Sequence, residues 1–229
     1  MKRRQLRKAF TLVELLIVIS IIGVLAAMVM PAVTGAMTYA NKVKSVNNAR
    51  GIAQAWNQAA RGERVRPVGG ESIYDWAFIL AQRADLNLPS MWILDFDPVV
   101  NDKIGMGASM PANIGDKIGN IWKISEEFKA FPISWEVANL VSPNAPGESP
   151  LLWSRGLSSN GMWSKDDGVF GDKGGHMAFV DMSVKWFDKL RDDSNPRGVL
   201  KRYDETMPTF NINDSIRGGA KNILKSQNM

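Results

Sequence analysis

The chain has 229 residues, 45% hydrophobic and 22% charged, which suits a folded domain that buries its own core and excludes a wholly disordered chain. It contains no cysteine, which excludes disulfides and thiolate chemistry. Its net charge of +5 comes from residues 1–9, because the rest has 23 basic residues against 23 acidic ones. This distribution argues against nucleic-acid binding, since the body of the chain has no basic excess.

A continuous apolar stretch runs from Phe10 to Val33, and Glu14 is its only charged residue. At about 1.5 Å per residue, a helix of this length reaches roughly 36 Å, enough to cross a hydrocarbon core of about 30 Å. The basic residues before it predict that the start stays cytoplasmic and that the later residues lie outside. The segment therefore predicts a single membrane span.

An ordinary secretory signal peptide or an uncleaved signal anchor has the same basic start and apolar core. The long apolar run, its early acid and the helical sequence beyond it argue against this alternative. A carboxylate in lipid costs a few kcal/mol and normally has a partner. A cut before Phe10 would create an amine able to pair with Glu14 of the same or a neighbouring chain.

The run KAFTLVELLIVISIIGVLAAM (8–28) resembles the signal of type IV prepilins and type II secretion pseudopilins. The resemblance implies that prepilin peptidase cuts between Ala9 and Phe10, that Phe10 is N-methylated, and that Glu14 guides assembly. The family usually has Gly before the cut, and this chain has Ala9. It further implies a non-enzymatic subunit, inserted in the inner membrane with a periplasmic C-terminal domain, that joins an assembly platform and polymerises into a periplasmic or extracellular filament.

The predicted organisation has four parts: a leader at 1–9, a membrane half of the first helix at 10–33, its amphipathic half at 34–61, and a globular domain at 62–229. Together they predict an α+β pilin fold, in which a long kinked N-terminal helix packs on a small antiparallel β-sheet domain. The alternative is a membrane-anchored periplasmic binding or enzymatic domain whose signal anchor is not cleaved.

Pro31 predicts a kink in the first helix, because proline removes a backbone donor and clashes with the preceding turn. Gly23, Pro31 and Gly35 are candidate soft points. An apolar stripe at helical spacing continues the helix to about Arg61, with the polar residues, including Asn48, on other faces. The stripe consists of Val33, Met37, Ala40, Val43, Val46, Ala53, Trp56 and Ala60.

A second helix of about fourteen residues is predicted after residues 62–70, with Ser72 and Asp75 as a capping box. Beyond it, short apolar runs separated by Gly, Pro, Asn and Asp predict strands. The expected strands lie within 91–96, 131–141, 151–157, 176–180 and 184–187, the last two forming a hairpin, with a short one near 208–210. Residues 97–120 are predicted to be a surface loop, and the last ten residues to be mobile.

The segment GDKGGHMAFVDMSVKWF (171–187) resembles a C-terminal element of pilin-like proteins from Planctomycetes and Verrucomicrobia. That element carries a Gly-rich lead-in, a His and a hydrophobic strand that ends in Asp-Gly. Met182 stands here where Gly is common, so a different turn is expected. The resemblance favours a pseudopilin-type subunit.

Catalysis is not indicated, because His176 is the sole histidine and the sequence has no nucleophile elbow or phosphate-binding loop. Calcium is the one ion to consider, since type II pseudopilins often bind it in a C-terminal loop. Two acidic groups are candidates: first Asp95, Asp97, Asn101 and Asp102, and second Asp166, Asp167 and Asp172. Neither has the spacing of a defined calcium loop, which favours solvated turn acids and no cofactor.

Eight tryptophans also raise the question of carbohydrate stacking. Trp56, Trp76 and Trp186 lie in apolar patterns that predict core positions. The surroundings of Trp122, Trp153 and Trp163 are not determined by the pattern, and no sugar ligand follows from them.

Overall fold

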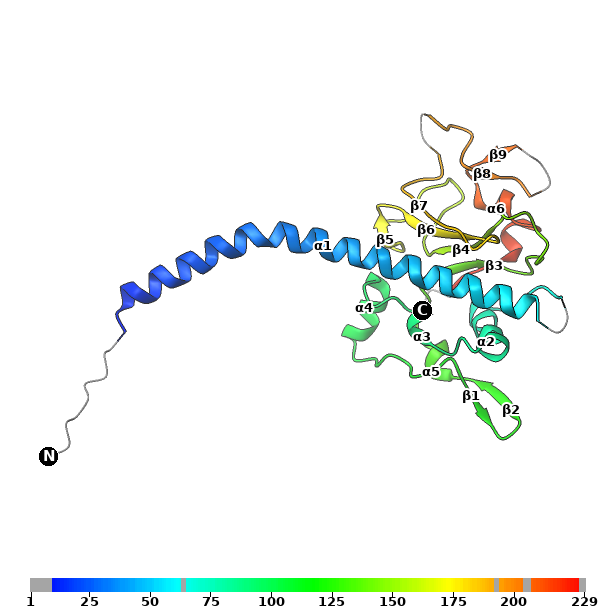
Figure 1. The fold of residues 1–229 in the computed structure, drawn as a ribbon, viewed down its shortest axis with the longest axis horizontal. Helices are drawn as coiled ribbons and strands as arrows, with labels where there is room; N and C mark the ends of the chain where they lie inside the picture. Colours follow the sequence, from blue (N-terminus) through cyan, green and yellow to red (C-terminus); the bar gives the residue numbers. More distant parts are fainter. Residues whose placement is uncertain (1–9, 63–64, 192–193, 204–206, 227–229) are drawn as a thin grey trace. The chain divides into compact units, whose positions relative to one another are not determined.

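The computed structural model describes residues 10–62, 65–191, 194–203 and 207–226. The predicted leader, including Ala9, lies outside these residues. The chain divides into two compact units, Met1–Val43 and Lys44–Met229, each described by itself below. A long N-terminal helix is followed by a small antiparallel-sheet domain (Figure 1), so the predicted α+β class is confirmed.

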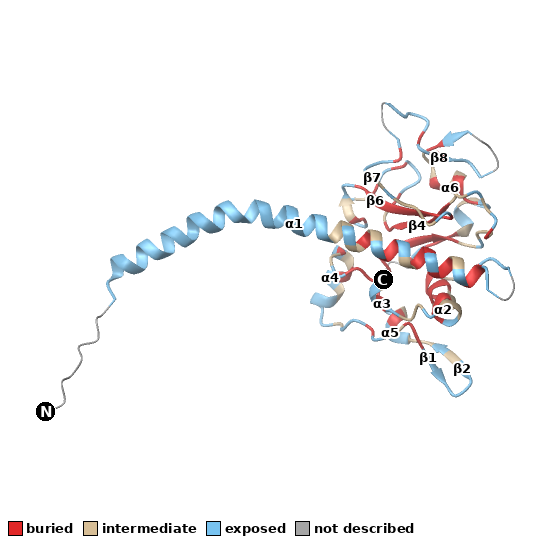
Figure 2. Cartoon of the chain, viewed as in Figure 1, coloured by how far each residue is buried: buried red, intermediate tan, exposed pale blue. Residues whose placement is uncertain are grey.

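The first helix, α1 (Leu12–Ala60), begins and ends close to the predicted bounds and runs through Pro31 without a break. In the first unit, every residue from Phe10 to Ala40 is exposed (Figure 2). By length and composition this helix could cross a membrane. Its apolar surface is therefore available to lipid or to another apolar partner.

In the second unit, the buried face of α1 begins at Ser45, which differs from the predicted stripe. Asn48, which was predicted to lie on another face, is buried and donates from Nδ2 to the Ser90 carbonyl at 2.8 Å. The prediction was wrong here because apolar periodicity cannot detect a polar residue that is buried by pairing with backbone. The buried face consists of Ser45, Asn48, Ala49, Ile52, Ala53, Ala55, Trp56, Ala59 and Ala60.

The second helix, α2 (Ile73–Ala84), has the predicted capping box, with reciprocal contacts between Ser72 and Asp75. It ends at Asp85, whose φ of 54° stops the helix in the left-handed region. The strand predicted at 91–96 is wrong, because α3 (Pro89–Trp92) and a turn occupy it. Proline at the first helical position favours that short helix over a strand.

The predicted surface loop at 97–120 is also wrong in part, since it contains α4 (Pro98–Gly105) and β1 (Gly115–Ile118). Strand β1 pairs with β2 (Ile121–Ile124) as an antiparallel hairpin. A short helix, α5 (Glu126–Lys129), follows and starts at a Ser125 cap.

The main sheet has five strands in the order β10-β3-β4-β6-β7, and every neighbouring pair is antiparallel. Four strands, β3 (Trp135–Ala138), β4 (Pro150–Ser154), β6 (Gly175–Phe179) and β7 (Val184–Phe187), match predicted segments. The fifth, β10 (Ile223–Leu224), pairs with β3. The predicted mobile tail is therefore wrong for these two residues, which complete the edge of the sheet.

The turn between β6 and β7 is the predicted hairpin turn, and Met182 in it adopts a φ of 65°. Glycine adopts that left-handed conformation more readily than other residues, so Met182 takes a glycine-like backbone conformation in this turn. Both the backbone N–H and the hydroxyl of Ser183 donate to Asp181 Oδ1, at 2.9 and 2.6 Å. The side-chain hydrogen bond is the main reason that the pKa of the Asp181 carboxyl lies below its ordinary value.

The remaining elements are short. Strand β5 (Val169–Asp172) precedes β6, and β8 (Leu200–Lys201) pairs with β9 (Pro208–Thr209) close to the predicted position. Helix α6 (Ile212–Ser215) and the 3-10 helix η1 (Gly219–Asn222) connect this pair to β10.

The alternation of side chains along the strands divides the core between the two faces of the sheet. Trp135, Val137 and Ala178 belong to the cluster that includes the buried residues of α1 and α2. Trp153 and Met177 belong to a second cluster built with Leu190, Leu200, Ile212 and Ile216 from the C-terminal segments. Because successive side chains on a strand point to opposite faces of the sheet, the same strands contribute residues to both clusters.

Candidate functional site

The first candidate site is the start of α1. Phe10 directly precedes the helix, and Glu14 lies in its first turn as the only charged residue between residues 10 and 33. Both are exposed. Ala9, the predicted residue before the cut, is outside the described residues.

Thr11 and Glu14 form a reciprocal cap at this helix end, which our sequence analysis missed. The Thr11 backbone N–H and hydroxyl donate to Glu14 Oε2 at 2.9 and 2.8 Å, and the Glu14 N–H donates to Thr11 Oγ1 at 3.2 Å. The detectable signal was Thr-x-x-Glu before an apolar run. The cap holds the Glu14 carboxylate at the N-terminal end of the helix, on Thr11, the residue that follows Phe10.

The orientation of Glu14 suits pairing with a cation. A carboxylate at a helix N-terminus is favoured by the exposed backbone N–H groups and by the helix dipole. One carboxylate accepts several hydrogen bonds, so capping by Thr11 does not exhaust its capacity. The arrangement can therefore hold both the first helical turn and an amine that approaches the same end.

The three predicted soft points all lie inside continuous helix. An added Cβ at Gly23 or Gly35 would meet nothing within 4 Å. Beside Pro31, the Thr34 hydroxyl donates to the Met30 carbonyl at 3.0 Å. Serine and threonine bonds of this kind often accompany helix bending. The stretch is helical throughout, and its softness stays a prediction.

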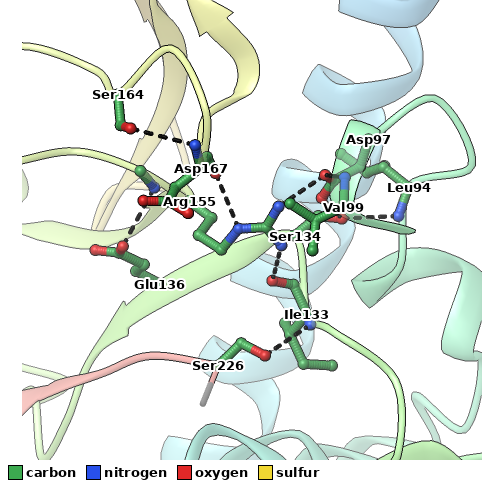
Figure 3. Close-up of polar contacts among 11 residues, drawn as sticks. Leu94, Asp97, Val99, Ile133, Ser134, Glu136, Arg155, Ser164, Asp167 and Ser226 are labelled. Atoms are coloured by element: carbon green, nitrogen blue, oxygen red, sulfur yellow. Dashed lines mark hydrogen bonds and ion pairs between the residues drawn. The ribbon is translucent and has the colours of Figure 1, made fainter. Parts of the chain in front are cut away.

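A buried ion pair lies within the globular unit, between Arg155 at the end of β4 and Asp97 at the cap of α4 (Figure 3). Arg155 Nη2 donates to Asp97 Oδ1 at 2.7 Å, and the Ser134 hydroxyl donates to Oδ2 at 2.7 Å. The other two guanidinium nitrogens also donate: Nη1 to the Ile133 carbonyl at 2.8 Å and Nε to the Asp167 carbonyl at 3.0 Å. Asp97 is 0% exposed and Arg155 5%. Such complete pairing orders several separate loops around one charge pair.

Glu136 is a second buried charge, on β3, and Figure 3 shows it near Arg155. Its oxygens accept hydrogen bonds from Trp153 Nε1 at 2.9 Å and from the Gly156 N–H at 3.3 Å, and Lys225 Nζ lies 3.2 Å away. Glu136 and Arg155 line an open groove of about 330 Å³. These contacts tie the Gly156 turn and the C-terminal segment at Lys225 to β3, so Glu136 orders the segments around it.

The phenol of Tyr74 links α2 to the C-terminal strand region. It donates to the Phe131 carbonyl at 2.9 Å and lies 3.2 Å from the Ser226 hydroxyl, which accepts from the Ile133 N–H at 3.1 Å. Burial raises the pKa of the Tyr74 phenol, and the hydrogen bond with Ser226 partly opposes that shift. This network holds the last described residues against the domain.

His176 lies on β6 and contacts α1. Its Nδ1 is 2.9 Å from the Ser45 hydroxyl, and its ring packs edge-on against Trp186 at 4.8 Å and Phe170 at 5.7 Å between centroids. Ser45 is 0% exposed and His176 3%, so a substrate has no direct route to this serine–histidine pair. The contact with Ser45 holds this part of α1 against the sheet.

Two of the calcium candidates, Asp95 and Asp97, are engaged in ion pairs. Asp95 Oδ2 lies 2.8 Å from Lys44 Nζ, and the Asp97 carboxylate pairs with Arg155. Asn101 and Asp102 are exposed on α4. Among the described residues, no group of three or more histidine, cysteine or acidic side chains is arranged to hold a metal, and this includes the group Asp166, Asp167 and Asp172.

Most tryptophans belong to the core. Trp153 and Trp163, whose places the pattern left open, are buried, as are Trp56 and Trp76. Trp186 is half-buried rather than fully buried, and Trp122 is half-buried against Phe78 at 6.4 Å between ring centroids. The tryptophans thus stabilise the domain instead of forming an exposed stacking platform.

Comparison with known proteins adds one finding. A family model described as the prokaryotic N-terminal methylation motif matches residues 4–30. No curated protein and no solved structure matches the chain. The match supports a type IV pilin-like prepilin signal at the start of the chain, and with the apolar helix it is consistent with a single-pass membrane anchor. This class of motif points to a structural subunit.

Proposed function

We propose that the chain is a structural subunit of a type II secretion pseudopilus or a type IV pilus-like filament. Prepilin peptidase removes residues 1–9, Phe10 becomes the methylated N-terminus, and the inner-membrane assembly platform adds the stored subunit to a filament. The observation that carries the proposal is Glu14, the single charge in the exposed apolar stretch 10–33, most of which the methylation motif covers.

Two physical requirements support polymerisation through α1. The helix exposes large side chains along its first half, including Leu15, Ile19 and Met28, and these need lipid or other helices around them. Glu14 in the same environment needs a cationic partner. A filament core of staggered helices meets both requirements, since the cleaved Phe10 amine of one subunit can neutralise Glu14 of its neighbour.

The element at 171–187 extends the proposal to a pseudopilin-type subunit. His176 fastens β6 to α1 through Ser45, and Met182 forms the tight turn that follows the strand. We propose that this element keeps the sheet attached to the second part of α1 while subunits pack. The periplasmic or extracellular position of the domain belongs to the same proposal.

The sharpest test is the N-terminus of the processed protein. N-terminal sequencing and intact mass of chain purified from membranes should give a start at Phe10 with one added methyl group. A start near Ala27 would show signal-peptidase cleavage and overturn the proposal. An intact Met1 would favour the uncleaved-anchor alternative.

A second test separates assembly from folding. Glu14→Ala should reduce sheared or cross-linked filaments at least tenfold, on the order of the loss expected from removing a charge-assisted pair. The matched control is Glu71→Ala, which removes an exposed carboxylate from the globular unit. Unchanged assembly in Glu14→Ala, with correct membrane insertion, would refute the role of this residue.

A further inference from the structure

A second cavity lies in the globular unit, between the loop that joins β3 to β4 and the end of α6. It measures about 350 Å³, and we call it the Ser215 cavity. This volume falls at the lower end of the range for small-molecule sites, which suits a ligand of one or two sugar rings. None of the site residues discussed above lines it.

Ser215 provides the first indication of a ligand. It is 3% exposed, lines the cavity, and its hydroxyl has no hydrogen-bond partner among the described residues. Leaving a buried hydroxyl unpaired costs about 1–3 kcal/mol, so such a group in a native structure calls for an explanation. A ligand with hydroxyl groups would supply the missing partner.

The other lining groups define the chemistry. Asn144, Ser142 and Ser149 present amide and hydroxyl groups, which both donate and accept hydrogen bonds. Sugar hydroxyls need partners with that dual capacity. Pro146 and Tyr203 add apolar surface, against which the C–H face of a pyranose ring packs.

The charge of the lining restricts the ligand further. Arg217 lines the cavity and is exposed, while none of the described lining residues is acidic. A guanidinium binds a carboxylate through two parallel hydrogen bonds, a geometry that a neutral sugar cannot use. The lining therefore favours a ligand with one negative group beside several hydroxyls.

We propose that the Ser215 cavity binds an acidic sugar, a pyranose ring that carries a carboxylate. Arg217 pairs with the carboxylate at the mouth, Ser215 hydrogen-bonds a ring hydroxyl inside, and Tyr203 covers one face of the ring. A subunit with this cavity would attach a filament to acidic polysaccharide. The binding site itself does not depend on the proposed function, because every residue lies in the globular unit.

The test is ligand-observed NMR and calorimetry on the full chain in detergent, with three matched probes. Glucuronate has both the ring and the carboxylate, glucose has the ring alone, and acetate has the carboxylate alone. We expect saturable binding of glucuronate, with glucose and acetate each at least tenfold weaker, the loss that follows from removing a hydrogen-bonded charge or its companion hydroxyls.

Two variants assign the contacts. Arg217→Ala should weaken glucuronate binding about tenfold and leave glucose binding unchanged, and Ser215→Ala should weaken both sugars about fivefold. Ser215→Ala removes an unpaired hydroxyl, so its melting temperature without sugar should stay equal or rise. The matched control, Arg197→Ala, removes an exposed arginine that does not line the cavity.

Three results would overturn the proposal. The first is the absence of saturable glucuronate binding by a folded chain. The second is equal binding of acetate and glucuronate, which would mean that Arg217 attracts any anion. The third is unchanged sugar binding in Ser215→Ala with an unchanged melting temperature, which would place the sugar elsewhere on the chain.

Discussion

Replacing Asp97 by alanine should be among the most destabilising single changes in the globular unit. The carboxylate is 0% exposed and pairs at 2.7 Å with Arg155, whose own side chain is buried. Removing one partner of a buried pair leaves an uncompensated charge and costs about 3–5 kcal/mol. For a domain of this size each kcal/mol lowers the melting temperature by about 2–4 °C, so the expected decrease is roughly 6–20 °C.

The assay is urea and thermal unfolding of the full chain in detergent, followed by the fluorescence of its buried tryptophans. The matched control is Asp95→Ala, because Asp95 pairs at 2.8 Å with Lys44 and the two side chains are 62% and 40% exposed. An exposed pair contributes at most about 1 kcal/mol. The double variant Asp97→Ala/Arg155→Met should recover much of the loss, because it removes the stranded charge as well.

An Asp97→Ala variant that loses no more stability than Asp95→Ala would refute the predicted cost of the unpaired buried charge. A double variant that is clearly less stable than Asp97→Ala would also refute it, because replacing Arg155 would then add a second loss of stability where a recovery is expected. Either outcome would show that the buried charges are solvated in another way and do not order the loops around them.

Three further predictions use the same unfolding assay. Gly198→Ala should lower the free energy of unfolding by about 1–3 kcal/mol, because φ is +97° and the added Cβ would lie 2.2 Å from the backbone of Thr209 and Phe210. Gly105→Ala, which has open space around it, should cost far less stability. Equal losses in the two variants would contradict this prediction. Stability should fall as the pH rises above about 10, because burial raises the pKa of the Tyr74 phenol in the folded state and the unfolded phenol therefore ionises first. Tyr74→Phe should reduce that loss. An unchanged dependence of stability on pH in this variant would refute the prediction. Adding calcium at about 1 mM should leave the melting temperature unchanged within about 1 °C, because Asp95 and Asp97 already pair with basic groups. A rise of several degrees would reveal a calcium site.

The helix at the start of the chain was predicted most fully from the sequence. An uninterrupted apolar run identifies a helix from local information, because its length and its single acid need no knowledge of distant residues. The capping box of α2 was predicted for the same reason, since all its contacts lie within four residues. The Thr11–Glu14 cap carries an equally local signal, because its contacts also lie within four residues.

Errors arose where a local pattern has two structural solutions. The apolar residues 91–96 fit a strand by composition, yet Pro89 starts a short helix there and Trp92 packs edge-on against Trp76 in the core. Residues 97–120 have little periodicity, but Asp97 caps α4 and its burial is compensated by Arg155, 58 residues further along the chain. Pairing over that separation leaves no trace in a local window.

Four features follow from local sequence, because each depends on neighbouring residues: the methylation motif, the apolar span, the position of Glu14 and the hairpin of β6 and β7. Which polar groups are buried depends instead on the fold. It brought Ser45 to His176, Arg155 to Asp97 and the Ser215 hydroxyl to its cavity, since burial depends on which distant segments pack together. The physical reason is that a polar side chain enters a core only with a partner, and the partner is supplied by the fold.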